Sequence, residues 1–131
     1  MDSKTVLLNF PWPPSVNTYW RALPTGRVIL SAKGRDYRNE VCEYVIAEGV
    51  RHHTERLKVE IYAFVPDRRR RDLDNILKAL FDAMEHAGVY EDDEQIDDLR
   101  IVRRPRMKPG CLAIVITELE SGWDDELGDS P

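Results

Sequence analysis

Residues 57–88 read LKVEIYAFVP and then DRRRRDLDNILKALFDAMEHAG, and the pattern of apolar residues changes its period between the two parts. Along the first part, apolar residues alternate with other residues, which predicts a strand that ends at Pro66. In the second part they recur every three or four positions, which predicts a helix from Asp72 to the stop signal Gly88. The apolar residues at helical spacing are Leu73, Leu77, Leu80 and Met84. A strand and a helix joined by a basic loop therefore form the centre of the chain.

Upstream of this unit, the sequence predicts a strand, an irregular segment and a helix. Residues 5–10 are mainly apolar and run into three prolines, so we expect a strand that ends in a stiff turn. Residues 15–30 carry turn signals and no clear period, which indicates a loop or a ragged hairpin. Ser31 is a good N-cap, and the apolar residues of 32–49 have helical spacing, which predicts an amphipathic helix.

Downstream of the central unit, the sequence predicts two more strands. These are residues 97–104 and 112–118, and the Pro/Gly turn across residues 105–110 predicts that they form a hairpin. The order of elements is typical of a single α+β domain, with a mixed β-sheet and two helices packed on it. We place this domain at residues 1–118 and expect residues 119–131 to form an acidic, disordered tail.

Length and composition agree with one small domain. The chain has 131 residues, of which 42% are hydrophobic and 33% charged, enough for a modest core under a strongly polar surface. No run approaches the roughly 18 apolar residues that cross a membrane, and the start lacks a signal-peptide pattern. We therefore expect a cytoplasmic protein without a membrane partner. Cys42 and Cys111 lack metal-binding spacing, so we expect core residues rather than a disulfide framework.

Charge is distributed unevenly along the chain, whose formal net charge is −5. Six acids and no Lys or Arg fall in residues 118–131, so residues 1–117 carry 19 basic and 18 acidic residues. Four consecutive arginines occupy positions 68–71, and a second basic block lies at 100–108. Between the two blocks, residues 91–98 contain six acids. Because local fields attract a polyanion more than net charge does, the basic blocks are compatible with a nucleic-acid partner.

Asp72 and Asp74 lie one residue apart where the basic loop meets the predicted helix. In extended backbone, side chains at this spacing point to the same side, so both carboxylates can approach one ligand. Two carboxylates about 4 Å apart repel by roughly 4 kcal/mol at an effective dielectric constant of about 20, which a cation would relieve. Oxygen ligands without His or Cys favour Mg²⁺ or Mn²⁺. A helix cap and a dipole-compensating acid explain the two residues equally well.

Other residues near these acids also have two interpretations. An EF-hand is excluded, because its glycine and final glutamate positions hold Leu77 and Ala83. Lys78 lies one helical turn after Asp74, where it would approach a metal-bridged ligand or form a plain salt bridge. Asp93 lies in an acidic turn of a kind that is ordinarily a solvated loop.

Three groups of residues are candidates for contacts with DNA. Four adjacent arginines would repel one another on a free surface, whereas a phosphate backbone would compensate their charge. This group consists of Arg68, Arg69, Arg70 and Arg71. Arg103 and Arg104 belong to the second basic block. Asn17 offers hydrogen bonds to DNA, whereas the aromatic residues after it, Tyr19 and Trp20, are of a kind that more often belongs to the core than to a stacking surface.

Taken together, these motifs resemble those of the RusA family of Holliday-junction resolvases. The matching segments are PWPPSVN at residues 11–17, PDRRRRDLDN at 66–75, Gly88, and DDEQ at 92–95. The resemblance covers residues 5–119, nearly the whole predicted domain.

The resemblance implies roles for four residues and a function for the chain. Asp72, Asp74 and Asp93 match the metal-binding catalytic aspartates of the family, and Lys78 matches its essential lysine. The family consists of small endonucleases, common in bacteria and their prophages. It implies a homodimer that uses Mg²⁺, with Mn²⁺ as an alternative, to nick paired strands of a four-way DNA junction in recombination and repair.

The need for two incisions also favours a dimer, because one small chain offers one acidic site. Two other classes of function stay open. One is a different metal-dependent structure-specific nuclease, such as a flap nuclease or a nonspecific DNase. The other is a noncatalytic DNA-binding module whose acids serve only structure.

Overall fold

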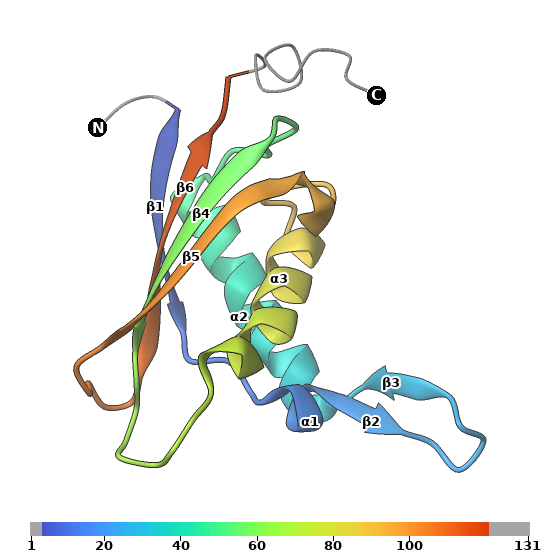
Figure 1. The fold of residues 1–131 in the computed structure, drawn as a ribbon. Helices are drawn as coiled ribbons and strands as arrows, with labels where there is room; N and C mark the ends of the chain where they lie inside the picture. The colour runs from blue at the N-terminus through green and yellow to red at the C-terminus, as the bar shows by residue number, and fades with distance from the viewer. Residues whose placement is uncertain (1–3, 121–131) are drawn as a thin grey trace, which may run out of the picture.

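The computed structural model describes residues 4–120, which form a four-stranded mixed sheet with two longer helices on one face (Figure 1). The strands of this sheet are β1 (Thr5–Pro11), β4 (Leu57–Phe64), β5 (Ile96–Arg104) and β6 (Cys111–Glu118). Their spatial order is β1-β6-β4-β5, with β4 and β5 parallel and the other neighbours antiparallel. The predicted α+β class and mixed sheet are confirmed.

The core lies between the sheet and the helices. Along β4 and β6, buried positions alternate with half-buried ones. For β4, this confirms the period of two that the sequence predicts. Val59 and Ile61 of β4 pack with Ile114 of β6 in one buried cluster. Burial of such side chains is the main favourable term in folding, at about 25 cal/mol per Å² of apolar surface.

The helix after Ser31 is confirmed as α2 (Ala32–Glu48), and the Ser31 hydroxyl accepts a hydrogen bond from the Gly34 N–H at 3.0 Å. The helix predicted from Asp72 is divided into a 3-10 turn, η1 (Leu73–Ile76), and a helix, α3 (Leu77–His86). Asp72 itself is extended, and its carbonyl oxygen accepts from the Asn75 N–H at 3.2 Å, which tightens the first turn.

The irregular segment before α2 contains more structure than expected. The ragged hairpin is present as β2 (Trp20–Ala22) and β3 (Val28–Leu30), but a one-turn helix, α1 (Val16–Tyr19), precedes it. The described chain therefore has three α-helices rather than two. A Cβ atom on Gly34 would lie 2.5 Å from the Tyr19 carbonyl oxygen, so glycine is needed for α2 to pack this closely against the end of α1.

The predicted hairpin between residues 97–104 and 112–118 is wrong, because β4 lies between β5 and β6. In β6, one face is buried and the other is half-buried, which suits a central strand with a neighbour on each side. β5 carries charged residues on both faces, which are tolerated at the edge of a sheet. Parallel strands need a long crossover, and here it consists of the basic loop, η1, α3 and the acidic turn.

Other expectations concern the cysteines and the ends of the chain. Cys42 and Cys111 are free, but the prediction that they are core residues is wrong: both are half-buried, because the adjacent positions turn inward. Of the predicted tail, Leu119 donates its N–H to the Arg56 carbonyl oxygen at 2.8 Å, and Glu120 lies 3.6 Å from Lys4. Residues 121–131 lie outside the described part. Within residues 4–120, no helix combines the length and apolar character needed to cross a bilayer.

Candidate active site and nucleic-acid interface

A cavity of about 500 Å³ lies along one side of α3, and it holds three of the four predicted catalytic residues. Asp74 comes from η1, Lys78 from the first turn of α3, and Asp93 from the short 3-10 helix η2 (Asp93–Gln95). The structure thus brings Asp93 together with Asp74 and Lys78, although most of the crossover segment separates Asp93 from them in the sequence. We name this the α3 cavity.

Asp72 lines a separate, small cavity of about 30 Å³, together with Trp12, Arg71 and Asn75. Its side chain makes no capping hydrogen bond to η1, so a helix cap does not account for it. The plain salt bridge considered for Lys78 is also absent: across residues 4–120, Lys78 pairs with no carboxylate. Asp72 and Asp74 are thus both exposed to solvent, and they line different cavities.

Asp93 belongs to a close acidic group that the sequence did not reveal in full. One carboxylate oxygen each of Glu85, Asp92 and Asp93 lies within 4.8 Å of the others. Burial, followed by the hydrogen bond and negative charge of Asp92, raises the pKa of Asp93 above its ordinary value. Neither Asp72 nor Asp74 joins a group of three such ligands in the described chain. Glu85 follows Lys78 by seven residues, a helical repeat that was a usable signal.

The acidic turn is held in place by Gln95. The Gln95 Oε1 atom accepts hydrogen bonds from the N–H groups of Glu91 and Asp92 at 2.8 and 3.0 Å. Its Nε2 atom donates to the carbonyl oxygens of His53 and Glu55 at 3.1 and 2.9 Å. The Asp92 carboxylate accepts from the Glu94 N–H at 2.9 Å and so caps η2. Asp93 has no such capping task and lines the α3 cavity.

Asp82 also lines the α3 cavity, and its negative charge is already balanced by a cation. Arg38 on α2 donates to both of its oxygens, at 2.8 and 3.0 Å, and the Tyr19 hydroxyl donates to it as well. Burial raises the pKa of Asp82, but the hydrogen bonds from Arg38 and Tyr19 outweigh it and leave that pKa below its ordinary value. We therefore interpret Asp82 as a tie between α2 and α3.

The basic loop presents most of its cations to solvent. Arg71 is the exception, because it donates two hydrogen bonds to Asp67, at 2.8 and 3.3 Å. The side chain of Arg69 is 80% exposed and lies 3.9 Å from Asp67, a separation that adds little stability. Arg68 and Arg70 are exposed and unpaired within residues 4–120.

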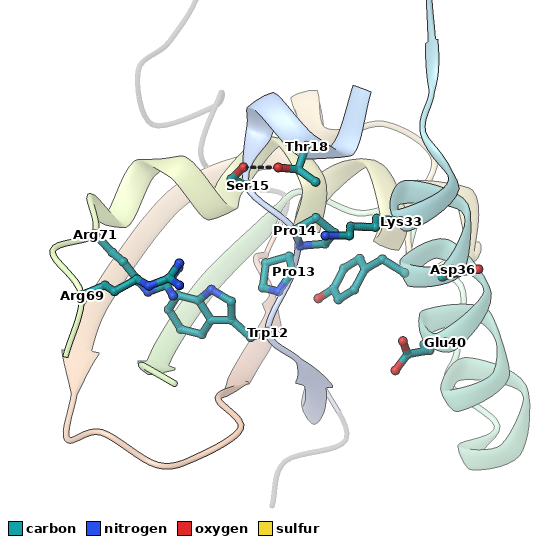
Figure 2. A pocket seen from close by; sticks show the side chains of 11 residues that line it. Trp12, Pro13, Pro14, Ser15, Thr18, Lys33, Asp36, Glu40, Arg69 and Arg71 are labelled. Carbon is teal, nitrogen blue, oxygen red and sulfur yellow. Dashed lines mark hydrogen bonds between the residues drawn. The ribbon is translucent and has the colours of Figure 1, made fainter. Parts of the chain in front are cut away.

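The other predicted DNA contacts are placed around this loop. Arg103 of β5 is exposed and donates from Nη2 to the Arg71 carbonyl oxygen at 2.7 Å, so the second basic block adjoins the first. Arg104 is exposed at the end of β5, and Asn17 is exposed on α1. Beside α1, a third cavity of about 470 Å³ lies between the proline-rich turn, α2 and the basic loop (Figure 2). Its walls come from three distant segments, so no local pattern could have predicted it.

Comparisons with known proteins give relatives over most of the chain. The family described as "Endodeoxyribonuclease RusA" matches residues 11–117. A "Crossover junction endodeoxyribonuclease rusA" from Enterobacteria phage HK97 is 49% identical over 112 residues, covering 85% of this chain and 92% of the relative. The protein of that name from Escherichia coli strain K12 is 42% identical over 119 residues, covering 88% and 96%. The one from Enterobacteria phage 82 is 42% identical over 116 residues.

Proposed function

The chain belongs to the RusA family of endodeoxyribonucleases, and on this premise we propose that it resolves four-way DNA junctions by paired, metal-dependent nicks in recombination and repair. One observation carries this proposal. Asp74, Lys78 and Asp93, which the family resemblance picks out as catalytic, come from separate parts of the crossover and line one cavity. The exposed arginines of the neighbouring loop are available for the phosphates of the substrate.

The metal would be Mg²⁺, with Mn²⁺ as an alternative, held by Asp72, Asp74 and Asp93. Asp74 and Asp93 already line the α3 cavity, whereas Asp72 lines the separate small cavity and would have to turn its side chain toward them. The donors suit a hard cation, because they are carboxylate oxygens, and a positive charge would offset the burial and the negative charge of Asp92 that raise the pKa of Asp93. When bound, such a metal polarises a phosphate and lowers the pKa of an attacking water. The carboxylates thus act as ligands and supply no nucleophile.

Lys78 and the arginines would act on the substrate directly. The Lys78 ammonium group is exposed in the α3 cavity and unpaired in the described chain, so it can offset charge that builds up on the scissile phosphate. The guanidinium groups of Arg68, Arg69 and Arg70 would hold the backbone of the arms and orient the cut strand. Arg103 and Asn17 would extend this basic surface on either side of the loop.

The proposed assembly is a homodimer. One chain carries one α3 cavity, and a four-way junction is resolved only when two strands of like polarity are cut at symmetric positions. Two-fold symmetric DNA is matched by a protein with the same symmetry. A monomer would leave nicked junctions as its product.

A labelled synthetic four-way junction tests the proposal. We expect symmetric nicks in two strands with Mg²⁺ and none with a chelator. Equal cutting of flap or plain duplex substrates would indicate the broader nuclease class. Junction binding without cleavage in either Mg²⁺ or Mn²⁺ would indicate a noncatalytic DNA-binding module.

A further inference from the structure

The third cavity has a layout that the proposed cleavage chemistry does not use. Figure 2 shows Arg69 and Arg71 on one side of it, Asp36 and Glu40 on the other, and the ring of Trp12 near the arginines. Its volume of about 470 Å³ lies in the range of small-molecule sites. We name this the Trp12 cavity.

The arginine side suits a phosphate group. Arg71 is oriented in advance by its hydrogen bonds to Asp67, and its guanidinium carbon lies 5.9 Å from the centre of the Trp12 ring. Arg69, next to it, is highly exposed. Two guanidinium groups beside each other recognise a phosphate better than a single ammonium group does, because each offers paired N–H donors.

The middle of the cavity suits a flat ring. Trp12 is half-buried, and Pro13 beside it is buried, so the floor is apolar and fixed. The Tyr37 hydroxyl donates to the Pro11 carbonyl oxygen at 2.8 Å and holds the proline-rich turn against α2. Stacking on an aromatic side chain is open to any nucleobase, since every base has a π-face.

The α2 side of the cavity disfavours a second phosphate, because its two acids, Asp36 and Glu40, outnumber its one cation, Lys33. Asp36 and Glu40 are one turn apart on α2, both are exposed, and neither is ion-paired within residues 4–120. Carboxylates repel phosphate but accept hydrogen bonds from the N–H groups of a base edge. Cations at one end, an aromatic floor and acceptors at the other end match a single nucleotide better than a continuous backbone.

The Trp12 cavity also adjoins the proposed cleavage site. The small cavity that contains Asp72 shares Trp12, Ser15 and Arg71 with it. We propose that the Trp12 cavity binds one unstacked nucleotide of the cut strand, next to the scissile phosphate, with its phosphate at the arginines and its base on Trp12. This inference rests on the proposed function for its substrate, but its test does not require cleavage.

The test is a double-mutant cycle between Trp12 and single bases of the junction. Junction affinity is measured in chelator, so that no strand is cut, with one abasic nucleotide moved stepwise through the positions around the crossover. Trp12→Leu keeps apolar packing and loses the ring, whereas the matched control Trp12→Phe keeps a ring. We expect Trp12→Leu to weaken binding about tenfold and Trp12→Phe to restore most of it.

The expected coupling is confined to one position. At that position, removing the base should weaken junction binding by the wild-type protein about tenfold. The same removal should hardly change the affinity of the Trp12→Leu protein, because both changes remove the same contact. Independent losses at every position would overturn the inference, as would coupling at a position remote from the mapped nick. If the coupling is found but Mg²⁺ produces no nicks, the proposed nuclease function fails while the nucleotide site stands.

Discussion

At the residue scale, Asp74 is the sharpest test of the metal site. Asp74→Asn removes a ligand's charge and keeps the size of a side chain that is exposed and not needed for packing. We expect Mg²⁺-dependent cleavage to be abolished while junction affinity stays within a few fold, measured by parallel cleavage and gel-shift assays. Asp98→Asn, which removes the same charge from an exposed site on β5, is the control and should cleave normally. A loss of helical circular dichroism along with activity would count against the catalytic role.

The acidic turn allows a second comparison at this scale. Asp93→Asn should remove cleavage, because Asp93 faces the α3 cavity. Asp92→Asn should have little effect, because asparagine also caps a helix and the Asp92 carboxylate is used in capping η2. Single-turnover cleavage rates of the two variants decide between them. Normal rates in the Asp92, Asp93 double variant would remove this turn from the site.

The basic loop is tested by the salt dependence of binding. Changing Arg69 and Arg70 together to Ala should reduce the slope of log K against log salt by about 1 to 2 units, because each lost phosphate contact releases about one fewer counterion. The control is Arg56→Ala, since Arg56 already pairs with Asp97 and Glu94, at 2.6 and 3.0 Å. If the slope is the same in both variants, the loop arginines do not contact phosphates.

At the scale of elements, the tie between α2 and α3 predicts a pH dependence of stability. The folded state lowers the pKa of Asp82, so its contribution is present above the ordinary carboxyl pKa of about 4 and is lost as pH falls through the lower folded value. We expect Asp82→Asn to cost about 1 to 3 kcal/mol in the free energy of unfolding at pH 7, and less below pH 4. Urea unfolding between pH 3 and 7 measures this, and an equal cost at every pH would contradict it.

Local sequence patterns were enough to predict the elements that bury a regular face. The alternation of β4 and the capped start of α2 are read from a few adjacent residues, and both are confirmed. The partner of β5 could not be predicted in this way. β4 rather than β6 lies beside β5, and this order of strands depends on the whole sheet rather than on a local pattern. The one-turn helix α1 was missed for a similar reason, since Tyr19 is buried by α2 and α3 rather than by a periodic neighbour.

The candidate site was predictable only where its residues cluster in the sequence. Asp72, Asp74 and Lys78 lie within one short motif, and Asp93 was reached through the family resemblance. Glu85 was missed although its place seven residues after Lys78 on α3 was a usable signal. The Trp12 cavity was missed because it forms only when the proline-rich turn and the basic loop fold against α2.

At the scale of the whole molecule, the proposed dimer predicts the behaviour of mixed subunits. Heterodimers of wild-type and Asp74→Asn chains should nick one strand of a supercoiled cruciform plasmid and leave it as nicked circles, because each chain supplies one active site. Homodimers of the wild type should give linear product. A monomer by sedimentation at micromolar concentration, with linear product in proportion to wild-type chains and no excess of nicked circles, would defeat the dimer.

The parallel pairing of β4 with β5 also governs when the site appears during folding. A parallel pair forms only after its crossover loop closes, and loop closure over a long segment is an entropic cost that slows folding. Here that segment contains Asp72, Asp74, Lys78 and Asp93. A chain in which only the antiparallel strands β1, β6 and β4 have paired therefore has a large part of its sheet but no assembled α3 cavity. Junction cutting should thus return in step with the protection of β5 amides from hydrogen exchange, and not with the pairing of β1, β6 and β4 alone.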